Sequence, residues 1–281
     1  MRISFSTATF YHRGLRYSLR LAREAGYDGV EHALGHEYML GGPEAVERAV
    51  ALEGVPVLSV HPPFLPLPGW PRHLAKRVQR LAAVTRDLHA EVLVLHPPFL
   101  RGEASPRARG YTWLLGLARE VGGPGMRVCI ESVEYRKREH RYLLDDLEVL
   151  VRFAQERDCG VTFDTCHAGA NGQDLMQCYE IVRPALGNIH LSDVAWHAGG
   201  PRTHVLPGEG SLPLRQFLTA LARDGYDGLI TIEVHPREVG LFGHDRHMQR
   251  LKQALNLVRG ALAMDATDAT DAAGESEGIP A

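Results

Sequence analysis

The sequence predicts an α/β protein folded as a single (β/α)8 barrel. Short runs rich in β-branched residues alternate with longer segments of helical period, which is the pattern of parallel strands joined by helices. Eight strand-length runs occur, each followed by a helix-length segment, and eight such units close a barrel. Two internal echoes support a repeated unit: AREAGYDGVE (22–31) resembles ARDGYDGLITIE (222–233), and HPPFL occurs at 61–65 and again at 96–100.

The boundaries of the predicted elements follow from apolar runs and the turn residues between them. The predicted strands are residues 2–6, 29–32, 55–61, 91–96, 127–131, 160–164, 187–191 and 228–233. The predicted helices are residues 15–25, 43–52, 73–88, 106–121, 143–157, 175–185, 214–223 and 244–262. Both HPPFL copies end a strand, because Pro-Pro blocks further sheet pairing.

One domain, residues 1–262, is expected to hold the whole barrel. The last stretch, AMDATDATDAAGESEGIPA (263–281), consists of small and acidic residues of low complexity. Such a segment cannot bury enough apolar surface to order itself. Residues 263–281 are therefore predicted to be a disordered acidic tail.

Composition argues against several classes of partner. The formal net charge of −3 gives no broad basic field for a phosphate backbone. The four cysteines show no CxxC pair, and no uncharged apolar run reaches the roughly 18 residues of a membrane span. We expect a cytoplasmic protein, with a homo-oligomer as an open possibility.

Six consecutive predicted strands each carry, at or next to their last position, a residue of a type that binds metal. Parallel strands of a closed barrel point their C-terminal ends at one face, so these side chains are expected to converge there. Imidazole nitrogens and carboxylate oxygens bind hard or borderline divalent ions. The predicted ligands are His61, His96, Glu131, Asp164, His190 and Glu233. The fold prediction is thus a TIM barrel with a metal site at the C-terminal ends of the strands.

Other candidates lie on the loops after these strands. His167 and His204 are close enough to the set to serve a metal or a substrate; a helix cap is the alternative role for His167. His12, on the loop after the first strand, is expected to contact substrate. The Gly-rich loop THVLPGEGSLPL (203–214) is expected to expose backbone amides for a phosphate or sugar oxygen. Glu31 ends the second strand, and a solvated charge is its expected role.

Four segments resemble the xylose isomerase-like TIM barrels, a group of sugar isomerases, sugar epimerases and endonuclease IV-type AP endonucleases. They are GVTFDTCHA (160–168), NIHLSD (188–193), HVLPGEG (204–210) and LITIEVHP (229–236), and the likeness spans nearly residues 1–262. For the epimerase-like members, the resemblance implies that Glu131, Asp164, His190 and Glu233 bind one Mn, Mg, Co or similar ion. Glu131 and Glu233 would also flank the substrate carbon and move its proton, and His167 would contact substrate.

The endonuclease IV branch implies a different site with three zinc ions. All eight positions would then be ligands: His61, His96, Glu131, Asp164, His167, His190, His204 and Glu233. That branch carries Asp where this chain has Arg202, two residues before His204, and usually Asn where it has Ser192. The segment between His167 and His190 is also short for that branch. These departures favour a small-molecule enzyme, in which Arg202 is expected to contact substrate.

The sequence thus favours an isomerase or epimerase that depends on a divalent metal (Mn, Mg, Co or Zn, one to three ions per chain). Its substrate would be a small sugar or related polyhydroxy carbonyl compound, and the ion would stabilise an enediolate during proton transfer. The alternative is a zinc-dependent AP endonuclease that cleaves DNA at abasic sites. A barrel that binds metal without turnover is a third possibility.

Overall fold

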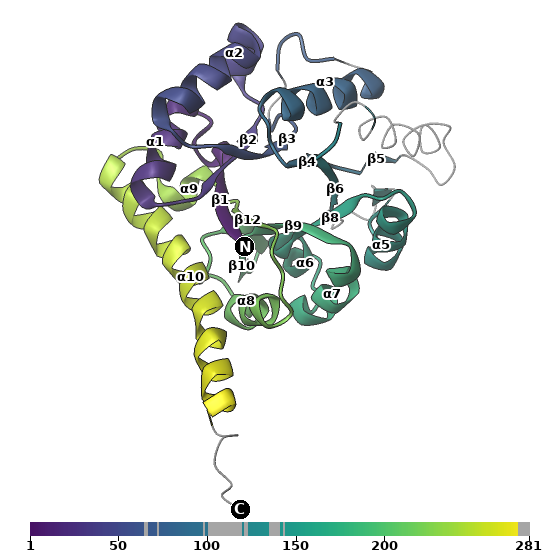
Figure 1. The fold of residues 1–281 in the computed structure, drawn as a ribbon, viewed down its shortest axis with the longest axis vertical. Coiled ribbons are helices and arrows are strands. Elements are labelled where there is room, and N and C mark those ends of the chain that lie inside the picture. Colours follow the sequence, from purple (N-terminus) through teal and green to yellow (C-terminus); the bar gives the residue numbers. More distant parts are fainter. Residues whose placement is uncertain are drawn as a thin grey trace, which may run out of the picture.

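The computed structural model describes residues 1–64, 67–71, 73–97, 99–100, 120, 123–134, 141–142 and 144–274. Eight parallel strands close into a barrel in the order β1-β12-β9-β8-β6-β4-β3-β2, which confirms the predicted fold class (Figure 1). They are β1 (Arg2–Ser6), β2 (Gly29–Ala33), β3 (Val57–His61), β4 (Val92–Leu95), β6 (Arg127–Glu131), β8 (Gly160–Asp164), β9 (Leu186–Leu191) and β12 (Leu229–Ile232).

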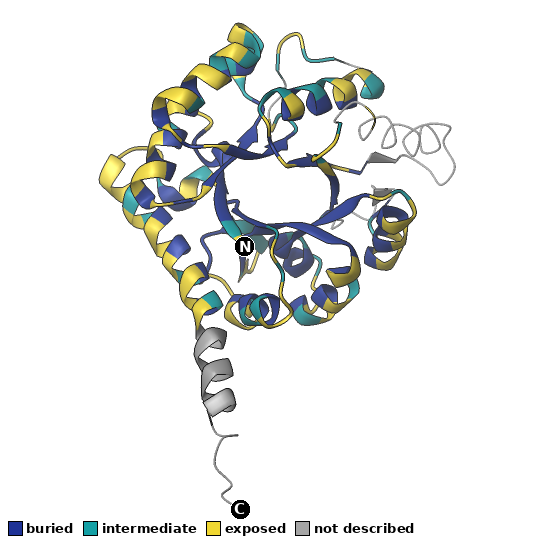
Figure 2. Ribbon diagram, in the orientation of Figure 1, coloured by how far each residue is buried: buried dark blue, intermediate teal, exposed yellow. Residues whose placement is uncertain are grey.

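Helices surround the barrel, with their buried sides against the strands and their exposed sides outward (Figure 2). They are α1 (Leu15–Ala25), α2 (His36–Glu53), α3 (Leu74–Asp87), α5 (Leu147–Glu156), α6 (Thr165–Ala170), α7 (Leu175–Val182), α8 (Leu214–Arg223), α9 (Pro236–Val239) and α10 (His244–Gly274), with 3-10 turns at Thr7–Phe10 and Arg183–Ala185. The predicted helix 106–121 lies outside the described residues, apart from residue 120.

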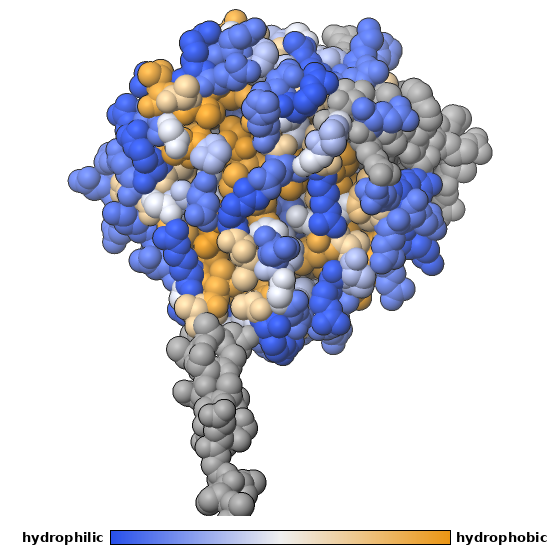
Figure 3. All heavy atoms as spheres, in the orientation of Figure 1, coloured by the Kyte–Doolittle hydropathy of each residue, from blue (hydrophilic) through white to orange (hydrophobic). Residues whose placement is uncertain are grey.

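Strands of the barrel are buried on both sides (Figure 2). A large cluster of buried apolar side chains joins strands to helices, and a smaller, separate cluster consists of Leu58, Val92, Val94, Cys129 and Leu229. Phe5, Phe163 and Ile130 are fully buried side chains on three of these strands. In the same orientation the outer surface is mainly hydrophilic at its edge, where the helices lie, and more apolar toward the middle (Figure 3). None of the described helices is both long and apolar enough to cross a membrane.

Two antiparallel pairs stand apart from the barrel. One pairs β5 (Phe99–Leu100) with β7 (Arg141–Tyr142). The other pairs β10 (Asp193–His197) with β11 (Gly200–Val205), and it follows β9 directly. This second hairpin carries His204 back toward the end of β12, since the amide of His235 donates to the carbonyl of His204 at 2.9 Å.

Two predicted boundaries are wrong for local reasons. The helix predicted at 43–52 begins at His36 instead, and Gly42, with φ of 66°, interrupts it immediately before Pro43. Glycine adopts this conformation without strain, and proline suits the first turn of the helical piece that follows. The helix predicted at 244–262 is longer, because α10 continues to Gly274; the division into a domain 1–262 and a tail 263–281 stays a prediction. Alanine-rich sequence extends an existing helix at little cost, since the nucleus is already formed.

Candidate metal centre

The inner group consists of Glu131, Asp164, His190 and Glu233, which come from four neighbouring strands. Glu131 and Asp164 are the last residues of β6 and β8, His190 lies in β9, and Glu233 follows β12. Asp164 and His190 are direct partners in the register between β8 and β9. One ligand atom from each of the four lies within 4.8 Å of the others, and all four residues are buried. The convergence expected from the strand ends is therefore present.

The donor atoms of the inner group suit a shared cation. His190 Nδ1 lies 2.9 Å from Glu233 Oε2 and 3.6 Å from Glu131 Oε1. Yet His190 Nδ1 makes no hydrogen bond, and Asp164 Oδ2 is likewise buried without one. Two ligands bound at 2.0–2.2 Å to one ion lie about 3–4 Å apart. The spacing and the unbonded atoms both fit an ion among these side chains.

Burial and charge set the protonation of this group. Burial alone would raise the pKa of Glu131 and Glu233, but neighbouring imidazoles outweigh it and hold both well below the usual range. The charge of His96, then that of His190, lowers the pKa of Glu131, and the charge of His190 lowers that of Glu233. Burial would lower the pKa of His61, but the contact with Glu131 and the surrounding carboxylates raise it to about 9. Without an ion, protonated imidazoles thus balance the carboxylates, and a bound cation would replace those protons.

His61 and His96 form a second group that shares Glu131. His96 Nε2 lies 2.9 Å and His61 Nε2 3.6 Å from Glu131 Oε2, and the two Nε2 atoms are 2.9 Å apart. His61 Nδ1 donates to the carbonyl of Pro62 at 2.7 Å, so the opposite nitrogen faces the group. One ligand atom of each of the three residues lies within 4.8 Å of the others.

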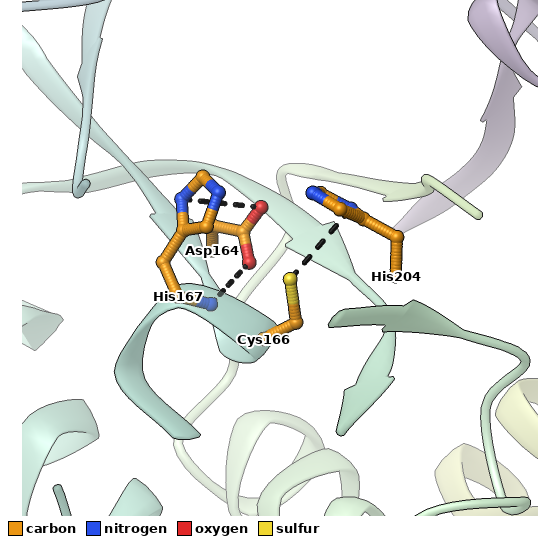
Figure 4. A group of neighbouring side chains, drawn as sticks. All are labelled: Asp164, Cys166, His167 and His204. Carbon is orange, nitrogen blue, oxygen red and sulfur yellow. Dashed lines mark hydrogen bonds and ion pairs between the residues drawn. The ribbon is translucent and has the colours of Figure 1, made fainter. Parts of the chain in front are cut away.

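His167 and His204 form a third group with Asp164 and Cys166 (Figure 4). The two imidazole rings stand nearly perpendicular, with centroids 5.5 Å apart, on either side of the Asp164 carboxylate. His167 Nδ1 donates to the carbonyl of Ser132 at 2.8 Å. The carboxylate of Asp164 caps α6 by accepting the amide of His167 at 2.9 Å, so Asp164, and not the side chain of His167, is the cap of this helix. All eight predicted ligands thus lie in three adjoining groups.

Cys166 is an unsuitable nucleophile. Its sulfur lies 3.6 Å from His204 Nδ1. Burial and the neighbouring charge of Asp164 raise the pKa of the Cys166 thiol well above its usual value. The uncharged thiol therefore predominates at neutral pH, and nucleophilic attack needs the thiolate.

His12 and Arg202 lie outside the three groups. The exposed His12 side chain bonds through Nε2 to the carbonyl of Leu241 at 3.0 Å. Arg202 lies on β11, with its guanidinium 3.7 Å from Glu238 Oε2. Their role as substrate contacts stays a prediction.

Glu31 is the residue whose role was misjudged from the sequence. It is fully buried, not solvated. Its Oε2 lies 3.1 Å from His190 Nε2 and accepts the hydroxyl of Ser59 at 3.0 Å. The sequence did hold a signal, because both copies of the internal repeat close a strand on a glutamate, Glu31 in the first copy and Glu233 in the last.

The loop 203–214 also differs from expectation. The amides of Gly208, Gly210 and Leu212 all donate to the carboxylate of Asp193, each at 3.0 Å. They are therefore engaged inside the protein, and the prediction that this loop offers them to a phosphate or sugar oxygen is wrong. Hydrogen bonds from amides to a buried, ionised carboxylate are strong, so these amides bond to Asp193 and do not face solvent.

Comparison with known proteins agrees with this architecture. An uncharacterised protein of Mycobacterium bovis is 26% identical over 255 residues, covering 83% of this chain and 89% of the relative. Fructoselysine 3-epimerase of Escherichia coli O157:H7 is 22% identical over 284 residues, covering 94% of this chain and 100% of the relative. The crystal structure of a D-tagatose 3-epimerase-like protein superposes with a TM-score of 0.70 at 18% identity, covering 96% of this chain and 100% of that one.

A family model matches the larger part of the barrel. It is described as "Xylose isomerase-like TIM barrel" and spans residues 19–259. Those residues include every member of the three ligand groups. The chain belongs to the xylose isomerase-like TIM barrel family.

Proposed function

We propose that this chain is a divalent-metal-dependent isomerase or epimerase of a small sugar or related polyhydroxy carbonyl compound. The observation that carries the proposal is the inner group, in which three carboxylates and one imidazole converge within 4.8 Å. The relatives named as a fructoselysine 3-epimerase and a D-tagatose 3-epimerase-like protein support the substrate class and the reaction type.

The residues that would hold the ion are Glu131, Asp164, His190 and Glu233. Mixed carboxylate and imidazole ligands suit Mn, Mg, Co or Zn. When bound, such an ion polarises the carbonyl and the adjacent hydroxyl of the substrate and lowers the cost of removing the neighbouring proton.

Proton transfer falls to the carboxylates of Glu131 and Glu233. β8 and β9 separate β6 from β12 in the barrel, so the two side chains enter from different directions. A substrate carbon between them would face one carboxylate on each side. In an epimerisation, one residue acts as an ionised carboxylate and takes the proton from this carbon, while the other acts as a carboxylic acid and returns a proton to the opposite face. The low pKa of both groups favours the ionised form that the accepting residue needs, and the donating residue must first take up a proton from solvent.

His167 is suited to orient the substrate. Because its Nδ1–H donates to the carbonyl of Ser132, neutral His167 has its lone pair on Nε2. That nitrogen can accept a hydrogen bond from a substrate hydroxyl. The His167 side chain is 17% exposed, so it is accessible from the mouth of the barrel.

The test is turnover of a panel of free and phosphorylated ketoses, with Mn, Mg, Co or Zn added to metal-free protein. Glu131→Gln should lower kcat about 10²–10⁴-fold, which is the usual contribution of a positioned acid or base. Glu180→Gln, on the exposed side of α7, is the matched control and should keep wild-type turnover. A barrel that binds metal but converts no member of the panel would contradict the proposal.

A second function has one specific observation in its favour. The eight candidate ligands form three groups that share Glu131 and Asp164, as a three-zinc AP endonuclease would require. Incubation with a duplex containing an abasic site separates the two functions. Three zinc ions per chain, with cleavage abolished by Glu131→Gln, would replace the epimerase proposal, whereas one ion per chain and an intact duplex would support it.

A further inference from the structure

Glu31 and His190 meet across the inside of the barrel. Glu31 lies on β2 and His190 on β9, and on the shorter way round the barrel β1 and β12 lie between them. Both side chains are fully buried. Their contact joins Oε2 of Glu31 to Nε2 of His190 at 3.1 Å, although the residues are 159 positions apart in sequence.

This contact fixes which side of the His190 ring faces the inner group. Nε2 points to Glu31, whereas Nδ1 lies 2.9 Å from Glu233 Oε2 and 3.6 Å from Glu131 Oε1. A neutral imidazole has one donor and one acceptor nitrogen. If Nε2–H donates to Glu31, the lone pair is on Nδ1, the nitrogen that faces the other ligands.

The accepting oxygen of Glu31 is itself held in place. Ser59 and Glu31 are partners in the register between β3 and β2. The hydroxyl of Ser59 donates to the same Oε2 at 3.0 Å. The second carboxylate oxygen, Oε1, is buried without a hydrogen-bond partner. Glu31 belongs to none of the three ligand groups, so its contacts are directed at His190 and Ser59.

We propose that Glu31 is a positioning residue for the metal ligand His190, holding its Nε2–H so that the Nδ1 lone pair faces the ion. The inference rests on the proposed function, because it requires an ion in the inner group. A carboxylate behind a ligating imidazole fixes the tautomer and the ring orientation, and its loss typically weakens metal binding 10–100-fold.

The test compares Co²⁺ binding by variants of the full chain after removal of metal with a chelator. Glu31→Gln keeps the shape of the side chain but removes its charge. It should raise the Kd for Co²⁺ about 10–100-fold and shift the visible ligand-field absorption of the bound ion. Glu53→Gln is the matched control, because Glu53 is 4% exposed and pairs with Arg16 and Arg23 outside the barrel. The Kd of this variant for Co²⁺ and the spectrum of the bound ion should remain those of the wild type.

Different results overturn different proposals. A Glu31→Gln protein with the wild-type Kd and spectrum overturns the positioning role and leaves the proposed function standing. A wild type that binds Co²⁺ tightly but converts no sugar overturns the proposed function, while the Kd comparison still decides the role of Glu31. A wild type that takes up no Co²⁺ overturns both.

Ser59→Ala keeps the inference testable if Glu31→Gln does not fold, as judged by its thermal unfolding without metal. This variant removes only the hydroxyl that holds Glu31 Oε2. It should raise the Kd for Co²⁺, by a smaller factor than expected for Glu31→Gln. An unchanged Kd for Ser59→Ala together with an unfolded Glu31→Gln would contradict the inference.

Discussion

Replacing Asp193 by Asn should destabilise the protein strongly. The Asp193 carboxylate is 1% exposed and accepts four backbone amides. Val194 and Leu212 donate to Oδ1 at 2.8 and 3.0 Å, and Gly208 and Gly210 donate to Oδ2 at 3.0 Å each. Asparagine retains one accepting oxygen and replaces the other with an NH₂ group, which is itself a donor. Two of the four amides therefore lose their acceptor and face another donor.

The expected cost follows from those two bonds. A hydrogen bond to a charged group contributes about 1.5–3 kcal/mol, so losing two costs about 3–6 kcal/mol. That is a large part of the roughly 5–15 kcal/mol by which a folded domain is stable. Equilibrium unfolding in urea, followed by circular dichroism, measures the difference between Asp193→Asn and the wild type.

Asp174→Asn is the control for this experiment. Asp174 caps α7 by accepting the exposed amide of Gln177 at 2.8 Å, and asparagine caps a helix about as well as aspartate. Its free energy of unfolding should stay within about 0.5 kcal/mol of the wild type. The reasoning is refuted if Asp193→Asn lies as close to the wild type as Asp174→Asn does.

Two further predictions concern the same face of the barrel. Gly210→Ala should lower the melting temperature, because a Cβ there would overlap the Asp193 carboxylate. Gly199→Ala is the control and should keep the wild-type melting temperature, because a Cβ there meets nothing within 4 Å. An equal fall in melting temperature for both variants would contradict this prediction. The pKa of His61 is raised to about 9 from 6.5, since the contact with Glu131 and the charges of nearby carboxylates outweigh burial. Protonation of His61 stabilises the folded, metal-free protein fully below pH 6.5, and this stabilisation is lost as the pH rises through the folded-state pKa of about 9. The melting temperature of the wild type, measured in the presence of a chelator, should thus fall between pH 7 and 10, and that of His61→Asn should fall less. If the melting temperatures of the two proteins change with pH in parallel, the prediction is wrong.

The strands were predictable because each is buried on both sides. The runs at 2–6, 127–131 and 160–164 match β1, β6 and β8 residue for residue. Each is a short run with β-branched or aromatic residues, which suits a strand of a parallel barrel. Helices with a clear apolar side, α1 and α8, were also predicted at their observed limits. The start of α2 was not predicted. The positive φ of Gly42 breaks the helix, and helical structure continues on both sides of this break, whereas the sequence pattern indicates a helix only after it.

The candidate ligands were predictable for a topological reason. Once eight parallel strands close, their C-terminal ends must meet, so the ligand types at those ends had to converge wherever the exact boundaries fell. The loops gave less information. Whether the amides of Gly208 and Gly210 face solvent or a carboxylate depends on where the β10–β11 hairpin places Asp193, and no spacing along the chain encodes that.

The sequence by itself determined the barrel and the set of side chains at its mouth, because both follow from the period of apolar residues and the residue that ends each strand. Only the tertiary structure decided how those side chains divide into three groups and which nitrogen of His190 faces the inner one. The physical reason is that contacts across the barrel, such as that of Glu31 with His190, depend on the closure and stagger of the strands. A sequence pattern records which face a residue lies on, whereas closure selects its partner on the opposite wall.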